Sequence, residues 1–431
     1  MLDLIIKPSF YELLSRFSAL VIPILLKLRT LQGKEDFLRK NERKGFTNLT
    51  RPNGVLVWIH ASSVGEALGA LPLINNLSEN KNLTILVTTG TVTSALILED
   101  RLPKTTIHQY VPLDYIGAVK RFLNHWKPDI ALWIESELWP NLILQTAKRD
   151  IPMVLVNARI SDRSVERWSK IPLLSKPILR AFTLILAQTS ADKEKLISLG
   201  AQNVRITGNI KFDSSKLPVD VSSLEKLQLE ISNRPCWLAA STHPGEENIV
   251  AKAHKTIASK HPTVLTILCP RHPSRGSELV SYLKTLNLKV AQRSQQDPIT
   301  TDTDIYLADT LGELGLFYRL SPIAFIGGSL VPMHGHNPIE AAQLGCAIIS
   351  GPDMRNFYDA DTTLSESLAM IKVNDEIELS AAVDNWLSNE SDRANAEQAA
   401  TKCLSLLTGA LDKTLVELEP ILNQQLGVRK K

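Results

Sequence analysis

The stretch Trp58–Leu68, WIHASSVGEAL, changes character twice along its length. Its apolar start is typical of a buried strand, its small residues of a turn, and its end of a helix. Glu66 falls in the first turn of that helix, where the SVGE sequence of Ser63–Glu66 matches the capping-box pattern. A carboxylate at this place can also accept a proton from a hydroxyl, provided that burial raises its pKa. The stretch alone leaves both roles of Glu66 open.

Short apolar runs alternate with helical patterns on the C-terminal side of this stretch. Helical patterns such as Tyr115–Trp126 and Leu138–Arg149 separate runs that are continuously apolar, as in a parallel sheet covered on both faces. This order predicts a doubly wound α/β domain. The expected strands are Val55–His60, Thr84–Thr88, Ile107–Val111, Ile130–Ile134, Met153–Asn157, Leu184–Ala187 and Val204–Ile206.

A polar stretch over residues 211–234 interrupts the alternation, and a second set of apolar runs follows it. These runs are Trp237–Ala240, Thr263–Leu268, Lys289–Ala291, Ile305–Leu307, Ile323–Ile326, Ala347–Ile349 and Met370–Val373. The sequence therefore predicts two Rossmann-like domains with a cleft between them. We expect a helical segment over 1–48, a first domain over 49–213, a linker over 214–234, a second domain over 235–408 and a terminal helix over 409–431.

Composition excludes several classes of protein. The 431 residues are too many for one core, and 44% hydrophobic and 22% charged residues are ordinary for a globular chain. A net charge of +3 says little about partners. The four cysteines form no CxxC pair, which fits a reducing compartment better than a disulfide framework or a zinc site. No GxGxxG follows a strand and no GxxxxGK[ST] occurs, so the dinucleotide and P-loop signatures are missing.

The N-terminal segment is apolar but interrupted by charge. Its longest uncharged run, Phe17–Leu26, is shorter than the roughly 20 apolar residues that span a bilayer. No small-residue cleavage site follows it, which argues against a signal peptide. Between Lys27 and Lys44 there are seven Lys or Arg residues against three acids. This pattern favours a helix lying in an anionic membrane face, and the alternative is a terminal helix packed on its own domain.

Polar side chains follow the strands of the first domain. Glu135 and Glu137 come directly after an apolar strand, where carboxylates are costly unless they are exposed or paired. The alternative is a helix start at which the dipole favours acids. Arg159, Arg163 and Lys211 follow later strands and bring positive charge to the same edge, although a lone lysine is often only a solvated surface residue.

Five loops of the second domain have the same character. Arg271, His272 and Arg275 lie on a proline-bounded loop suited to a phosphate or a carboxylate. Glu340, near a helix start, can accept hydrogen bonds from ribose hydroxyls. The DTD sequence at 302–304 could indicate a metal site, but it precedes a strand instead of following one. The five loops are ASTHPGEE (240–247), CPRHPSR (269–275), ADTLGELG (308–315), IGGSL (326–330) and GHNPIEAAQLG (335–345).

These loops together carry a resemblance. The ordered set HASSVGE, IESELWPN, TGNIKFD, ASTHPGEE, PRHPSR, DTLGEL, GGSL and GHNPIEAA resembles the 3-deoxy-D-manno-octulosonic acid (Kdo) transferases of lipopolysaccharide assembly. These enzymes transfer Kdo from CMP-Kdo to a lipid A precursor, lipid IVA. The resemblance implies a GT-B fold, an anionic membrane surface as partner, and attachment to the cytoplasmic face of the bacterial inner membrane. It implies no metal, no cofactor and no nucleic-acid partner.

The resemblance also implies roles for individual residues. Glu66 would be the catalytic base of an inverting transfer, and Glu137 and Lys211 would stabilise the transition state. The usual Met of the family's DTMGEL motif is Leu311 here. The implied contacts to CMP are Pro270, Arg271, Leu311, Gly312, Glu313, Asn337, Pro338, Ile339 and Glu340.

Other functions stay open from the residues alone. A different GT-B glycosyltransferase would use a UDP-sugar and a lipid acceptor. A sugar-nucleotide epimerase of the same fold would need neither the N-terminal segment nor an acceptor. A non-catalytic membrane scaffold would leave the polar residues at the strand ends unexplained.

Overall fold

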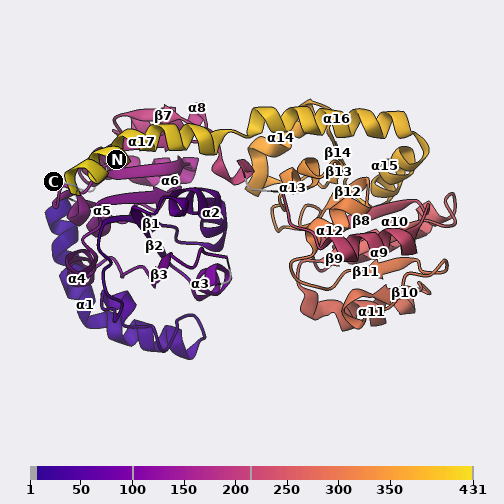
Figure 1. Ribbon diagram of the computed structural model, residues 1–431, viewed down its shortest axis with the longest axis horizontal. Helices are drawn as coiled ribbons and strands as arrows, with labels where there is room; N and C mark the ends of the chain where they lie inside the picture. The colour runs from indigo at the N-terminus through magenta and orange to yellow at the C-terminus, as the bar shows by residue number, and fades with distance from the viewer. Residues whose placement is uncertain (1–6, 100, 214–215, 430–431) are drawn as a thin grey trace. The chain divides into compact units, whose positions relative to one another are not determined.

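The chain forms two compact units, each built on its own sheet (Figure 1). The computed structural model describes residues 7–99, 101–213 and 216–429. Unit 1 comprises Met1–Ser214 with Thr408–Lys431, and unit 2 comprises Ser215–Leu407. Each unit holds a seven-stranded sheet whose pairings are all parallel, which confirms the predicted α/β class with two Rossmann-like domains.

The sheet of unit 1 has the strand order β3-β2-β1-β4-β5-β6-β7. All seven strands expected in this half of the chain are present, with ends that differ by one residue at most. They are β1 (Val55–His60), β2 (Leu83–Thr89), β3 (Ile107–Tyr110), β4 (Ile130–Ile134), β5 (Met153–Ala158), β6 (Leu184–Ala187) and β7 (Val204–Ile206).

Alternate strand residues point to opposite faces of this sheet, and the apolar residues on both faces are covered by helices. Trp58 packs on one face against Phe122 and Trp133, whereas Val57 and Ile59 belong to the cluster on the other face. The helices are α1 (Pro8–Leu31), α2 (Val64–Glu79), α3 (Val92–Glu99), α4 (Ile116–Trp126), α5 (Pro140–Ala147), α6 (Asp162–Ser169), α7 (Pro172–Arg180), α8 (Ser190–Ser198) and α17 (Ala410–Arg429), with 3-10 turns η1 (Glu42–Lys44) and η2 (Ile210–Asp213).

The sheet of unit 2 has the order β10-β11-β9-β8-β12-β13-β14. Its strands are β8 (Cys236–Thr242), β9 (Leu265–Pro270), β10 (Val290–Gln292), β11 (Ile305–Leu307), β12 (Ile323–Ile326), β13 (Ala347–Ser350) and β14 (Met370–Lys372). Its helices are α9 (Val221–Ile231), α10 (Glu246–Ala258), α11 (Gly276–Thr285), α12 (Leu314–Leu320), α13 (Pro338–Gln343), α14 (Tyr358–Glu366), α15 (Glu376–Ser388) and α16 (Glu390–Leu407), with 3-10 turns η3 (Pro273–Arg275), η4 (Arg293–Gln295) and η5 (Arg355–Phe357). Helix α9 forms within the polar stretch and packs against α12.

Each sheet has a point at which the strand order reverses direction. In unit 1 this switch point lies between β1 and β4, and in unit 2 it lies between β8 and β12. Loops that leave a switch point diverge to opposite faces and open a crevice, in which ligands of open α/β sheets bind. The WIHASSVGEAL stretch therefore contains the end of β1 at the switch point of unit 1.

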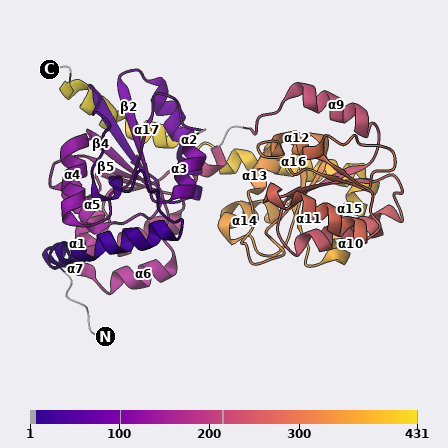
Figure 2. The same cartoon turned by 90° about the horizontal axis from the view of Figure 1, so that it is seen from below.

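Both ends of the described chain pack on unit 1. Leu418 and Leu422 of α17 are buried in the same cluster as Val57, so the yellow helix in Figure 1 lies among elements from the start of the chain. Ile22 and Leu26 of α1 are buried against α4. Figure 2 shows α1 running beside α7, with which it is in contact.

Helix α1 is bent, with 66° between Pro8–Phe17 and Val21–Leu31. Pro23 accounts for the bend because its ring clashes with the carbonyl of Ala19, one turn earlier. Among the described helices, none alone has the length and apolar character to cross a membrane, whereas the two halves of α1 taken together would.

Asp213 attaches α17 to unit 1. Its carboxylate accepts hydrogen bonds from the backbone N–H of Gly409 (2.5 Å) and of Leu411 (2.6 Å) at the start of the helix. We expect Asp213→Ala to leave these donors unpaired, at a cost of about 1–2 kcal/mol. Hydrogen exchange of the α17 amides should then become faster, whereas Asp412→Ala, at an exposed position of the same first turn, should change it little. Unchanged exchange in Asp213→Ala would contradict the assignment.

Candidate active site

Glu66 lies at the switch point of unit 1, in the first turn of α2. The hydroxyl of Ser63 accepts a hydrogen bond from the backbone N–H of Glu66 at 3.3 Å and donates one to its carboxylate at 2.9 Å. The carboxylate also accepts the backbone N–H of Ser62 at 2.7 Å. Ser63 therefore caps the helix as the pattern predicts, whereas Glu66 accepts the N–H of Ser62, one residue before the cap, and these bonds fix the direction in which its carboxyl group points.

Burial raises the pKa of Glu66 to about 7, and the negative charges of Glu137 and Glu135 add to this shift. The hydrogen bonds from Ser62 and Ser63 oppose it. A carboxyl group with this pKa exchanges its proton near neutral pH, as a general base requires. The capping geometry and a proton-accepting role are thus compatible at one residue.

The two acids that follow β4 are both paired, which removes the cost expected for them. Glu135 has a left-handed backbone conformation (φ 61°), its N–H donates to Val156 at 2.9 Å, and its carboxylate forms an ion pair with Lys211. Glu137 accepts a hydrogen bond at 2.6 Å from the indole N–H of Trp139. The residue Trp139 is 42% exposed.

Lys211 reaches this group from the turn η2. Its aliphatic part lies against Gly69, where a methyl group would come within 2.6 Å of Lys211 Cγ. Asn157, at the end of β5, holds the turn because its side-chain oxygen accepts the N–H of Ile210 at 3.1 Å. Sequence reasoning missed this role of Asn157, which has a left-handed backbone conformation in the structure (φ 58°).

The structure thus brings Glu66, Glu137 and Lys211 together at the carboxyl edge of one sheet. Arg159 and Arg163, which the sequence placed at the same edge, are exposed. No described hydrogen bond or ion pair joins either arginine to the carboxylates of Glu66, Glu135 or Glu137.

The predicted anion-binding loop of unit 2 follows β9. The side chain of Arg271 is exposed, and its backbone N–H donates to Thr242 at 2.9 Å, which joins the loops after β8 and β9. Arg275 differs from the expectation because it pairs with the buried carboxylate of Glu247 at 2.5 Å. Its charge is used inside the fold, and the available cation of this loop is Arg271.

The DTLGEL segment begins α12. Glu313 binds Arg293 through two hydrogen bonds of 2.6 and 3.1 Å, and this cation keeps the pKa of Glu313 low. Leu311 is 84% exposed, and Gly312 has φ 81° with open space where a side chain would be. Sequence reasoning missed Arg293, which no motif marks. A cavity of about 430 Å³ lies beside this pair, lined by Ser223, Lys226, Leu227, Glu230, Arg293, Ser294, Gln296, Asp297, Tyr306, Thr310 and Glu313.

Asn337 caps α13 and orients the remaining predicted contacts. Its side-chain oxygen accepts the N–H of Ile339 at 3.0 Å, and its amide donates to Glu340 at 3.4 Å. Pro338 occupies the first helical position, where its missing N–H costs nothing. Pro338 and Ile339 are buried, so Asn337 and Glu340 are the partly exposed members of this group.

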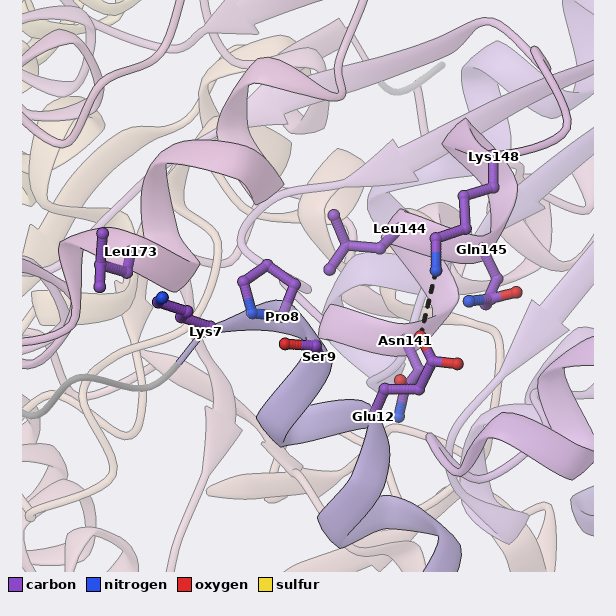
Figure 3. Close-up of a pocket in the computed structure, with 9 residues that line it drawn as sticks. All are labelled: Lys7, Pro8, Ser9, Glu12, Asn141, Leu144, Gln145, Lys148 and Leu173. Carbon is purple, nitrogen blue, oxygen red and sulfur yellow. Dashed lines mark hydrogen bonds and ion pairs between the residues drawn. The ribbon is translucent and has the colours of Figure 1, made fainter.

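Another cavity lies in unit 1, away from these residues. It has a volume of about 490 Å³ and is formed by the start of α1 together with α5 and Leu173 of α7 (Figure 3). In Figure 3 the ammonium group of Lys148 points to Glu12, with which it pairs at 3.1 Å. Within residues 7–99, 101–213 and 216–429, no three His, Cys, Asp or Glu side chains are grouped in a way that could hold a metal ion.

Two parallel-sheet units, with a buried carboxylate at one switch point and an exposed arginine loop on the other sheet, have the architecture that GT-B glycosyltransferases share with sugar-nucleotide epimerases. A solved glycosyltransferase from Rickettsia africae shares the fold, with a TM-score of 0.58, 14% identity, and coverage of 86% of this chain and 99% of that one. The family model for 3-deoxy-D-manno-octulosonic-acid transferase (kdotransferase) matches residues 38–214.

Curated relatives extend this match to nearly the whole chain. A 3-deoxy-D-manno-octulosonic acid transferase of Rickettsia bellii is 38% identical over 92% of this chain and 96% of its own length. One from Haemophilus influenzae is 35% identical over 96% of this chain and 99% of its own length. The chain belongs to the Kdo transferase family, and it is a glycosyltransferase that transfers Kdo.

Gly69 gives a test of the position of Lys211. We expect Gly69→Ala to displace the lysine and to lower kcat by between about tenfold and a hundredfold, as small misplacements of a site residue do. The fold should persist because alanine favours a helix interior by about 1 kcal/mol over glycine. Gly65→Ala on the same helix is the matched control, since a methyl group there meets nothing within 4 Å. Equal turnover in both variants would show that the position of Lys211 is unimportant.

Proposed function

We propose that this chain transfers Kdo from CMP-Kdo to the lipid A precursor lipid IVA with inversion, and that Glu66 is the general base. The buried carboxylate of Glu66, held by Ser62 and Ser63 at the switch point of unit 1, is the observation that carries the role of base, and burial raises its pKa to about 7. The acceptor is a sugar hydroxyl, whose proton must leave as the oxygen attacks the anomeric carbon of the donor. Attack on the face opposite the departing CMP inverts the configuration at that carbon.

Glu137 and Lys211 would stabilise the transition state beside Glu66. The transition state resembles an oxocarbenium ion, and its leaving phosphate gains negative charge. Lys211 is held by Glu135 and by the turn η2, so its ammonium group is placed before the substrate binds. Positioned charges of this kind need little reorganisation during the reaction.

The donor nucleotide would bind to unit 2. Arg271 supplies an exposed cation for the phosphate, and Glu340 a partly exposed carboxylate for ribose hydroxyls. The proposed contacts to CMP remain Pro270, Arg271, Leu311, Gly312, Glu313, Asn337, Pro338, Ile339 and Glu340. Mass measurement of the product from CMP-Kdo and lipid IVA, with release of CMP and not UDP, tests the choice of substrates.

Helix α1 would attach the enzyme to an anionic membrane, which we propose is the cytoplasmic face of the bacterial inner membrane. One face of the helix packs on unit 1 through Ile22 and Leu26. The opposite face presents apolar side chains at helical spacing, each 47–76% exposed, and basic residues follow it. These side chains are Phe10, Leu13, Leu14, Phe17, Val21, Ile24, Leu25, Leu28 and Leu31.

We expect Glu66→Gln to reduce kcat by at least about a hundredfold, because the amide cannot accept the hydroxyl proton. In the unmodified enzyme kcat/KM should rise with pH and level off above about 7, where Glu66 becomes ionised. Burial disfavours the charged form, so the free energy of unfolding of Glu66→Gln at pH 8 should be no lower than that of the unmodified enzyme. Glu79→Gln, exposed at the end of α2, is the matched control. Near-normal turnover in Glu66→Gln would refute the assignment.

We expect Phe17→Glu and Leu28→Glu each to weaken binding to vesicles that contain anionic phospholipid by about tenfold or more, since an apolar side chain no longer enters the lipid. Co-sedimentation with the vesicles measures this. Leu229→Glu, an equally drastic change at an exposed position of α9, should leave binding unaltered. Equal sedimentation of all three variants would exclude α1 as the attachment surface.

A further inference from the structure

Three imidazole rings meet at the switch point of unit 2. His243 follows β8, His272 follows β9, and His336 precedes α13. The Nε2 atoms of His243 and His336 are 2.8 Å apart, and the two rings meet head to head, with centroids 5.1 Å apart and 9° between their planes. The ring of His272 stands edge-on to His243, with centroids 5.8 Å apart. No family motif by itself predicts this cluster, because its members come from three separate loops.

The pair of His243 and His336 covers the glycine turn after β12. A methyl group on Gly328 would lie 3.1 Å from Cδ2 of His336 and 3.5 Å from Cδ2 of His243. Gly328 has φ 70°, so both the backbone and the close approach of the rings require glycine here. Because β12 and β8 are the strands that flank the switch point, the pair lies at the place where open α/β sheets bind ligands.

The turn itself has no backbone donors left for an anion. The buried carboxylate of Glu246 accepts the N–H groups of Gly328 (2.7 Å), Ser329 (3.1 Å) and Leu330 (3.0 Å). It also accepts the N–H of His243 at 3.0 Å. Glycine-rich turns often hold phosphate through such N–H groups. Here Glu246 occupies them, so a phosphate at this switch point has to be bound by side chains.

The imidazole pair can supply those donors. One Nε2 must carry the proton of the bond between the rings, so the other ring carries its proton on Nδ1 and presents an N–H donor. Within the described part of the chain, neither Nδ1 atom has a hydrogen-bond partner. The titratable and charged groups near the pair are His272, Arg271 and Arg275 on the neighbouring loop and Glu246 beneath it.

The lowered pKa values of both rings favour the neutral form of the pair near pH 7. Burial lowers the pKa of His243, and burial together with Arg271 lowers the pKa of His336 to about 3. A bound phosphate, which carries one negative charge in the sugar ester and up to two in free CMP, opposes the charge of Arg271 and favours uptake of a further proton by the pair, after which both Nδ1 atoms are donors. The histidine cluster can therefore distinguish a phosphate from a neutral ligand.

We propose that His243 and His336, with His272 beside them, form the subsite for the phosphate of the donor nucleotide, to which an Nδ1–H donates a hydrogen bond. This proposal rests on the proposed use of a cytidine monophosphate sugar. It adds His243 and His336 to the nucleotide site. These two residues recognise the leaving phosphate and not the base or the ribose. The ligand class is a nucleoside monophosphate, free or in its sugar ester.

Calorimetric titration of the full chain with CMP and with cytidine tests this subsite. The unmodified protein should bind CMP more tightly than cytidine, and His336→Ala and His243→Ala should each weaken CMP binding by about tenfold or more while cytidine binding stays constant. Removal of a histidine that only supported the fold would weaken both ligands together. The matched control is His261→Ala, a histidine of unit 2 that pairs with Asp384 at 2.9 Å, which should leave both affinities unchanged.

The outcomes separate this proposal from the proposed function. If the unmodified chain does not bind CMP, the choice of donor is wrong and the proposed function fails with it. If the unmodified chain binds CMP and both histidine variants bind it equally well, the donor stands and the phosphate subsite is overturned. Parallel loss of CMP and cytidine binding in the variants also overturns it.

Discussion

The parallel pairing of β1 with β4, and of β8 with β12, is the constraint on which both candidate sites depend. In each pair the strands are neighbours in the sheet but not along the chain, so the connections after them diverge. Glu66 and Glu135 come from the two loops of the first pair, and His243 and Gly328 from those of the second. Strand order therefore gathers side chains that the chain keeps far apart.

Glu66 and Glu246 occupy equivalent positions in the two units but serve different purposes. Each is a buried acid in the first turn of the helix after the first strand of its unit, and burial raises the pKa of both. Glu246 accepts four backbone N–H groups and joins the loops after β8 and β12. Glu66 accepts only one backbone N–H and one hydroxyl and is close to two other acids. Glu246 therefore holds the loops in place, whereas Glu66 keeps an affinity for protons near neutral pH.

Much of this arrangement was predictable from the sequence because its signals are local. Continuous apolar runs locate every strand, and the SVGE sequence indicates both the cap and the candidate base. The contacts that sequence reasoning missed are long-range. The pair of Arg293 with Glu313 and the pair of His243 with His336 join loops that no local pattern connects. Arg275 differs from the expectation for the same reason, since its partner Glu247 lies on another helix.

The attachment of α17 to unit 1 has a consequence for the order in which the protein is made. Unit 2 is a contiguous segment, whereas unit 1 is closed by residues that follow it in the chain. Leu418 and Leu422 fill the core beneath β1, so that core stays incomplete on the ribosome until α17 has emerged. The unit that is started first is thus finished last. Until then part of the apolar face of β1, the strand that precedes Glu66, is uncovered, a period in which a chaperone would be most useful.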